Sequence, residues 1–226
     1  MIAFGPVPSR RLGQSLGINN IPPKICTYSC IYCQLGRTIR MQANREEFYE
    51  PGEIAGDIEI KMEELRGKES PVDYLTFVPD GEPTLDVNID REIEFLKPVG
   101  IKIAVITNAS LIWDPDVREA LSKADWVSLK VDAVSENIWR KIDRPYRSLK
   151  LEMILDGMLN FAAGFSGTLT TETMLIQEVN DGGDEVERIA DFLAKLSPGR
   201  SYVSIPTRPP AEKWAKPAVE SSINMA

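Results

Sequence analysis

The stretch CTYSCIYCQLG, residues 26–36, decides which fold and which chemistry this chain can support. It holds all three cysteines of the sequence, Cys26, Cys30 and Cys33, in a C-x3-C-x2-C spacing with Tyr32 directly before the third. An odd number of cysteines in so short a stretch argues against a disulfide scaffold and favours a metal site in a reducing compartment. Thiolates are natural ligands of iron–sulfur clusters, and a short loop can direct three of them at one cubane.

A structural zinc site and a chance grouping of inert cysteines are the alternatives to a cluster. A structural zinc ion needs a fourth ligand, which in proteins is usually cysteine or histidine. The sequence contains no histidine and no further cysteine. It therefore favours one [4Fe-4S] cluster in which one iron has no protein ligand. The absence of histidine also excludes Ser-His-Asp and Cys-His catalysis.

Around the cysteines, short β-rich runs alternate with helical patterns, which is typical of βα units around a parallel sheet. The expected strands are residues 14–19, 74–78, 101–106, 126–131, 168–176 and 201–205. The expected helices are residues 53–66, 89–96, 114–122, 148–163 and 184–196. We predict an α/β fold, a partial, open (βα)6 barrel, because a closed eight-fold barrel typically needs about 250 residues.

The length of 226 residues indicates one domain. We expect residues 1–208 to form its core and residues 209–226, rich in proline and polar residues, to form an extended or partly disordered tail. No apolar run approaches the roughly 20 residues that a membrane helix needs, and the N-terminus lacks the long apolar core of a signal peptide. The expected location is the cytoplasm, without contact with a membrane.

The charge of the chain bears on its partners. The formal net charge of -8 does not support binding to nucleic acid. Arg10, Arg11, Arg37 and Arg40 nevertheless lie around the cysteine segment and could form a local basic patch, which leaves such binding open.

The cysteine spacing, with an aromatic residue before the last cysteine, resembles the radical S-adenosylmethionine (SAM) superfamily. The resemblance implies a radical SAM type of barrel in which Cys26, Cys30 and Cys33 hold a [4Fe-4S] cluster, SAM chelates the open iron, and Tyr32 belongs to the cofactor site. It also implies reductive cleavage of SAM to a 5'-deoxyadenosyl radical that abstracts hydrogen from a substrate. The electron would come from a one-electron donor such as flavodoxin or ferredoxin.

Two further stretches resemble motifs of this superfamily. PDGEPTL resembles the GGEP motif, with Gly81 and Glu82 matching and Asp80 in place of the first glycine. The resemblance implies that Glu82 or the backbone beside it contacts the methionine amino group of SAM. ITNASL resembles a TNG-type strand ending, which makes Thr107 and Asn108 candidates for the SAM or substrate face. Plain turns around Glu82 and Asn108 are the alternatives.

Polar side chains also follow the later strands, where the active site of such a barrel lies. In VSLKVDA, strand alternation would direct Lys130 and Asp132 toward the barrel interior. Lys130 would then meet the SAM carboxylate and Asp132 the ribose, or the two would form a structural ion pair. Glu172 or Gln177 is expected to contact substrate. Arg208 would bind an anionic substrate group or be a solvated arginine of the tail.

Over nearly the whole chain, from GPVPSRRLGQSLGIN at residues 5–19 to PTRPP at residues 206–210, the sequence resembles radical SAM proteins grouped with the tRNA wyosine-base synthase. The synthase itself binds a second cluster through further cysteines, which this chain lacks. Three hypotheses follow: a radical enzyme that modifies a small molecule or an RNA base, an activase that installs a glycyl radical on a partner enzyme, and a non-catalytic iron–sulfur electron carrier. A carrier would leave Glu82, Lys130 and Asp132 without a role.

Overall fold

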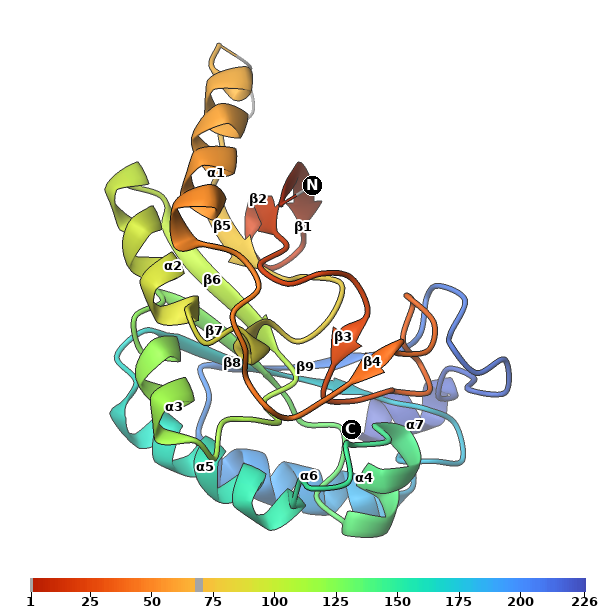
Figure 1. The fold of residues 1–226 in the computed structure, drawn as a ribbon. Coiled ribbons are helices and arrows are strands. Elements are labelled where there is room, and N and C mark those ends of the chain that lie inside the picture. Colours follow the sequence, from red (N-terminus) through yellow and green to blue (C-terminus); the bar gives the residue numbers. More distant parts are fainter. Residues whose placement is uncertain (1, 68–70) are drawn as a thin grey trace.

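A twisted sheet of seven strands forms the centre of the fold in the computed structural model, which describes residues 2–67 and 71–226 (Figure 1). The strands are β1 (Ala3–Ser9), β2 (Gly13–Ile18), β5 (Tyr74–Phe77), β6 (Lys102–Thr107), β7 (Trp126–Lys130), β8 (Thr168–Met174) and β9 (Arg200–Ser204). From β2 to β9 all neighbours are parallel, whereas β1 runs antiparallel to β2. Because β1 and β9 are opposite edges, the sheet is not closed, and the predicted open barrel is confirmed.

Helices lie along the outer side of the sheet, and the segment that carries the cysteines crosses its inner side (Figure 1). The helices are α1 (Pro51–Leu65), α2 (Ile89–Leu96), α3 (Pro115–Leu121), α4 (Glu136–Ile142), α5 (Leu151–Gly164), α6 (Gly183–Leu196) and α7 (Glu220–Met225). The short 3-10 helices η1 (Pro83–Leu85) and η2 (Lys97–Val99) flank α2, and the short strands β3 (Ile25–Cys26) and β4 (Arg40–Met41) pair with each other.

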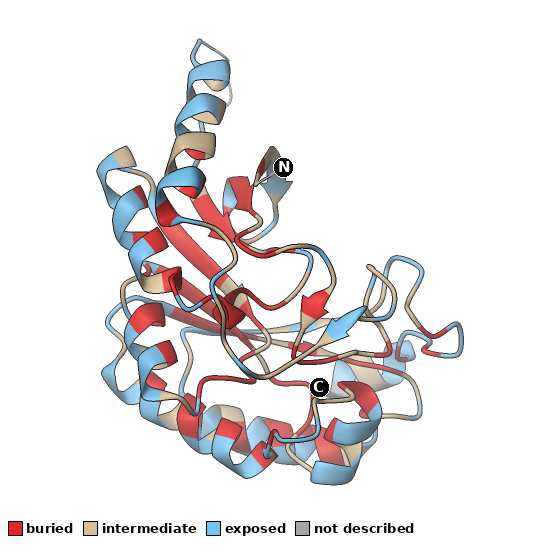
Figure 2. Ribbon diagram, in the orientation of Figure 1, coloured by how far each residue is buried: buried red, intermediate tan, exposed pale blue. Residues whose placement is uncertain are grey.

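The core lies between the sheet and the inward faces of the helices (Figure 2). In α2, Ile89, Ile93 and Leu96 recur at helical spacing and are completely buried, which fixes this helix against the sheet. In α1, the inward residues Ile54 and Ile58 are likewise buried. Burial of apolar side chains at this spacing is the main force that holds the helices on the strands.

One end of the barrel is closed by the turn between β1 and β2. Leu12, in this turn, is buried against Ala104 and Trp126, which lie near the starts of β6 and β7. The opposite end, where the parallel strands finish, therefore remains the place for a site, as the sequence predicted.

Each predicted strand and helix overlaps an observed element, but several elements were not predicted, among them β1 and α4. Strand β1 has the sequence AFGPVPS, whose glycine and two prolines are unfavourable inside a sheet. It is tolerated because an edge strand needs fewer backbone N–H donors. Helix α4 spans only seven residues, too few for a clear apolar periodicity.

The segment expected to be an extended or partly disordered tail, residues 209–226, ends in helix α7. Before this helix, Pro217 forms an isolated bridge with Ile176, and Glu212 is buried beneath two arginines. The tail is thus packed on the barrel and helical at its end, while the division of the chain at residue 208 stays a prediction. Among the described residues, no helix has the length and apolar character needed to cross a membrane.

The packing of α5 on the loop after β6 predicts the effect of one substitution. A methyl group added to Gly157 would lie 2.7 Å from the carbonyl oxygen of Ile112 and 2.7 Å from the amide nitrogen of Trp113. We expect Gly157→Ala to lower the free energy of unfolding by about 1–3 kcal/mol, as overpacking typically does, in urea titrations.

The matched control is Gly56→Ala in α1, where nothing lies within 4 Å of the added methyl group. Because alanine favours a helix over glycine, this variant should gain about 0.5–1 kcal/mol. Equal stability of the two variants would contradict the packing described for α5.

Candidate functional site

Cys26, Cys30 and Cys33 line one cavity of about 90 Å³, together with residues 79–81 of the loop that follows β5. None of the three thiols is in a disulfide. A side chain at position 81 would collide with the carbonyl oxygen of Ile25, so glycine is required for this loop to lie against the strand that carries Cys26. The predicted cysteines and Gly81 are therefore brought together at the carboxyl ends of the strands.

The donor set of this cavity fits an iron–sulfur cluster. Burial raises the pKa of the Cys26 thiol to about 12, and it raises the pKa of the Cys30 thiol well above its ordinary value. These thiols become thiolates only if a cationic group joins them. Within residues 2–67 and 71–226, no group of three or more Cys, His, Asp or Glu side chains is arranged as a ligand set for a single metal ion. Three thiols around a cavity instead suit a cluster of several irons.

Two polar side chains approach the cysteine sulfurs. Asn108 lies with its Nδ2 3.5 Å from the Sγ of Cys26 and donates a 2.8 Å hydrogen bond to the hydroxyl of Thr27. Asp143 lies with its Oδ1 3.4 Å from the Sγ of Cys30. Asp143 was not among the predicted site residues, although it lies in the IDRP stretch that contributes to the family resemblance.

Glu82 joins the loops after β5 and β6. Its buried carboxylate accepts hydrogen bonds from the Thr84 amide at 3.0 Å, from the Thr84 and Thr107 hydroxyls at 2.6 Å each, and from the Asn108 amide at 2.7 Å. Burial raises the pKa of this carboxyl, and the hydrogen bonds oppose that rise. Because both oxygens have partners within the protein, Glu82 and Thr107 hold the loops in place. Whether either also touches SAM stays a prediction.

Lys130, Asp132 and Tyr32 form the next group. The Tyr32 hydroxyl donates a short hydrogen bond to Asp132, whose other oxygen accepts from the Met174 amide at 2.6 Å. The Lys130 ammonium lies 3.9 Å from Asp132 and 5.1 Å from the centre of the Tyr32 ring. This is the structural ion pair that the sequence left open, and direct contacts of Lys130 and Asp132 with SAM stay a prediction.

Glu172 connects this group to the other edge of the barrel. It accepts from Lys130 at 3.1 Å and forms a short ion pair with Arg11, which stacks over the Tyr202 ring at 4.3 Å. Arg11 belongs to the turn between β1 and β2, so its side chain reaches across to β8 and β9 on the far side of the barrel. Burial alone would raise the pKa of the Glu172 carboxyl, but the adjacent cations lower it to about 2. Burial opposes the charge on Lys130, yet Asp132 and Glu172 raise the pKa of this ammonium overall.

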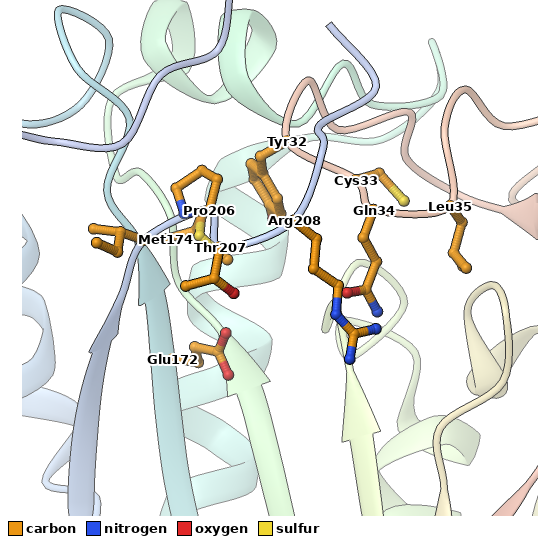
Figure 3. A pocket seen from close by; sticks show the side chains of 10 residues that line it. Tyr32, Cys33, Gln34, Leu35, Glu172, Met174, Pro206, Thr207 and Arg208 are labelled. Atoms are coloured by element: carbon orange, nitrogen blue, oxygen red, sulfur yellow. The ribbon is translucent and has the colours of Figure 1, made fainter. Parts of the chain in front are cut away.

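A larger cavity of about 310 Å³ adjoins the cysteines, with Cys33 and Leu35 shared between the two walls. In Figure 3, Glu172 of β8 lies on one side, the segment from Tyr32 to Leu35 lies on the other, and Arg208 reaches into the space between them. A third cavity of about 460 Å³ continues past Glu172 to Arg10 and Arg11. The predicted Glu172 and Arg208 are thus brought together.

Gln177 is not brought to these cavities, which it does not line. It lies beyond the end of β8, where its backbone amide donates to the carbonyl of Lys216 at 2.9 Å. Its expected contact with substrate therefore has no support in the geometry, and Glu172 is the better placed of the two alternatives.

Comparison with known proteins gives one family. A family model described as the radical SAM superfamily matches residues 20–193. The UPF0026 protein MJ1312 of Methanocaldococcus jannaschii is 50% identical over 216 residues, which are 96% of this chain and 67% of that protein. This chain thus spans about two thirds of the length of that relative.

Solved structures agree in fold. A radical SAM methyltransferase from Sphaerobacter thermophilus matches with a TM-score of 0.67 at 16% identity. The matched region covers 93% of this chain and 61% of the methyltransferase chain. TYW1 with a lysine-pyruvate adduct bound matches with a TM-score of 0.64 at 17% identity. The matched region covers 84% of this chain and 64% of the TYW1 chain. At such low identity the likeness concerns the fold alone.

The ion pairs of Glu172 predict how stability depends on pH. Its pKa of about 2 lies below the roughly 4.3 of a glutamate in an unfolded chain. The carboxylate therefore stabilises the fold above about pH 4, and this contribution is lost as the pH falls toward 2. Glu172→Gln should lower the free energy of unfolding by about 3 kcal/mol at pH 7, because it removes the carboxylate that pairs with both Lys130 and Arg11.

Urea titrations between pH 3 and pH 7 measure this difference, which should shrink toward pH 3. Glu187→Gln, at an exposed position of α6, is the control and should change little at any pH. A loss that stays constant over this range would contradict the ion-pair account of Glu172.

Proposed function

The chain belongs to the radical SAM superfamily, and we propose that Cys26, Cys30 and Cys33 hold one [4Fe-4S] cluster whose open iron binds SAM. Membership in this superfamily indicates an enzyme, and the proposal concerns its reaction. When bound, the cluster supplies the electron that cleaves SAM to methionine and a 5'-deoxyadenosyl radical. The observation that carries the proposal is the pair of adjoining cavities, one lined by three thiols and the next large enough for a cofactor.

SAM is proposed to occupy the larger cavity next to Cys33. Leu35, Met174 and Ile205 offer it apolar contacts, while Gln34 and Thr207 offer hydrogen-bonding groups. A mostly apolar cavity with a few polar groups is typical of a cofactor site. The same walls would keep water away from a reactive radical.

Glu82 is proposed to act as a positioning residue. Since its carboxylate is already used by Thr84, Thr107 and Asn108, the backbone around Gly81 is better placed to meet the methionine amino group. The carboxylate would keep that backbone and the Asn108 side chain in position beside Cys26. In this proposal the GGEP-like stretch contacts SAM through its main-chain atoms and not through the Glu82 side chain.

Lys130 is proposed to act as a fixed cation. A lysine that forms an adduct with a carbonyl compound, as in the TYW1 structure, must be a neutral amine when it reacts. Asp132 and Glu172 favour the charged form of Lys130 and raise its pKa. Lys130 would therefore orient the carboxylates at the site and take no covalent part in the reaction.

The substrate is proposed to occupy the cavity beside Arg10 and Arg11, which shares Glu172 and Met174 with the proposed SAM cavity, and to reach it from the open edge at β9. Hydrogen abstraction requires the substrate to lie next to the 5' carbon of SAM, and a joined cavity permits this. The open edge at β9 would admit a small molecule, an RNA base or a partner protein. A cytoplasmic location is part of this proposal.

The test is the formation of 5'-deoxyadenosine. The protein is reconstituted with iron and sulfide without oxygen, reduced with dithionite and mixed with SAM, and the products are separated by chromatography. We expect 5'-deoxyadenosine and methionine in equal amounts from the wild-type protein and neither from Cys30→Ala, which removes one thiolate ligand.

Cys variants also lose the cluster, so the control is Asn108→Ala, which removes the side chain beside Cys26 but no ligand. It should retain iron and form product more slowly. A wild-type protein that carries four irons and is reduced, yet forms no 5'-deoxyadenosine, would overturn the proposal.

A further inference from the structure

The beginning of the chain carries basic residues and no acidic ones. The first 45 residues contain six of the 26 lysines and arginines and none of the 34 aspartates and glutamates. All acidic residues of this protein of net charge -8 therefore lie beyond residue 45. The segment that provides the three cysteines is thus a positively charged part of an acidic molecule.

Part of this segment forms one wall of the cysteine cavity. Leu35, Gly36 and Thr38 line the cavity from inside. Between and after them, Arg37, Ile39 and Arg40 point outward; the Ile39 residue is 80% exposed, and the side chains of Arg37 and Arg40 are 72% and 54% exposed. We call Arg37, Ile39 and Arg40 the outer wall. A single segment of chain therefore separates solvent from the place proposed for the cluster.

Ion pairs hold the outer wall without cancelling its charge. Arg37 shares Glu212 with Arg144, at 3.0 and 2.6 Å, so two cations face one carboxylate. Arg40 pairs with Glu46 at 2.8 Å. Lys24 and Asp80, which line the cavity, add one charge of each sign. Over the outer wall and its ion-pair partners, three arginines face two carboxylates, so a surplus of one positive charge remains, and Ile39 lies among these charges as an exposed apolar side chain.

We propose that the outer wall is the docking surface of an acidic one-electron donor protein of the low-potential flavin or iron–sulfur class. This inference rests on the proposed function. In the docked complex one electron passes from the donor to the cluster, so the donor is oxidised by one electron and the cluster is reduced by one, and no bond forms or breaks. Opposite charges steer the encounter, and Ile39 supplies an apolar contact at its centre.

An RNA fits the outer wall less well than a protein. A nucleic acid would be held through its phosphates, for which an exposed isoleucine offers nothing. An RNA substrate would also have to reach the proposed SAM cavity, where Arg10, Arg11 and Arg208 are the nearby cations. The basic residues therefore fall into two groups, one at the cavity for substrate and one at the wall of the cysteines.

The test compares two reductants on the reconstituted protein. One is flavodoxin, an acidic flavin protein, kept reduced by its reductase and NADPH; the other is dithionite, which needs no docking surface. The variant is the double charge reversal Arg37→Glu/Arg40→Glu. The control is Arg66→Glu/Arg188→Glu, the same charge change at exposed positions just after α1 and in α6.

We expect the outer-wall variant to accept electrons from flavodoxin at least about tenfold more slowly at low salt, and the wild-type rate to fall as salt is added. With dithionite, the variant should form as much 5'-deoxyadenosine as the wild type. The control variant should match the wild type with both reductants. Ile39→Ser should slow reduction by flavodoxin with little change in its salt dependence, because it removes an apolar contact only.

Three outcomes would overturn the proposal: an unchanged rate with flavodoxin, an equal loss with both reductants at full iron content, or a loss of binding to an RNA oligonucleotide with normal reduction by flavodoxin. If instead the wild type forms no 5'-deoxyadenosine even with dithionite, that result contradicts the proposed function. A failure of the docking proposal alone leaves product formation with dithionite intact.

Discussion

The constraint on which the site depends is that three partly buried thiols line one cavity, where burial opposes the ionisation of two of them. Burial keeps Cys26 and Cys30 protonated, so a cationic group must enter before they can act as thiolates. The loops around the cavity serve this requirement. Glu82 fixes the loop after β5 to the loop after β6, and Gly81 lets the first of them lie against Ile25.

A second set of charges compensates for the open sheet. Since β1 and β9 do not pair, no backbone ladder joins the two edges. Arg11 instead extends from the turn after β1 to Glu172 in β8 and to the Tyr202 ring in β9. Glu172 in turn holds Lys130 and with it the group of Asp132 and Tyr32. Side-chain ion pairs thus tie the open side of the barrel to the cofactor region while leaving a cavity beside them.

The sequence predicted the parallel strands and the cysteine site because both depend on local patterns. Alternation of strand and helix needs only neighbouring residues, and so does the cysteine spacing. It did not predict β1, whose prolines are acceptable only at an edge, nor the short α4. The sequence also did not predict contacts between residues far apart in the chain. Arg11 and Glu172 are separated by 161 positions in the sequence, and Cys30 and Asp143 by 113. For Lys130 and Asp132 the sequence offered a ligand role or an ion pair, and only the fold placed them beside each other.

The central claim is that the three cysteines hold one cluster with an iron open to SAM. Electron paramagnetic resonance of the reconstituted, reduced protein, recorded with and without SAM, tests it most directly. We expect about four irons per chain, the signal of one reduced [4Fe-4S] cluster, and a clear change of that signal when SAM is added. A signal that SAM leaves unchanged, or a cluster that persists in full when Cys30 is replaced by alanine, would contradict the account.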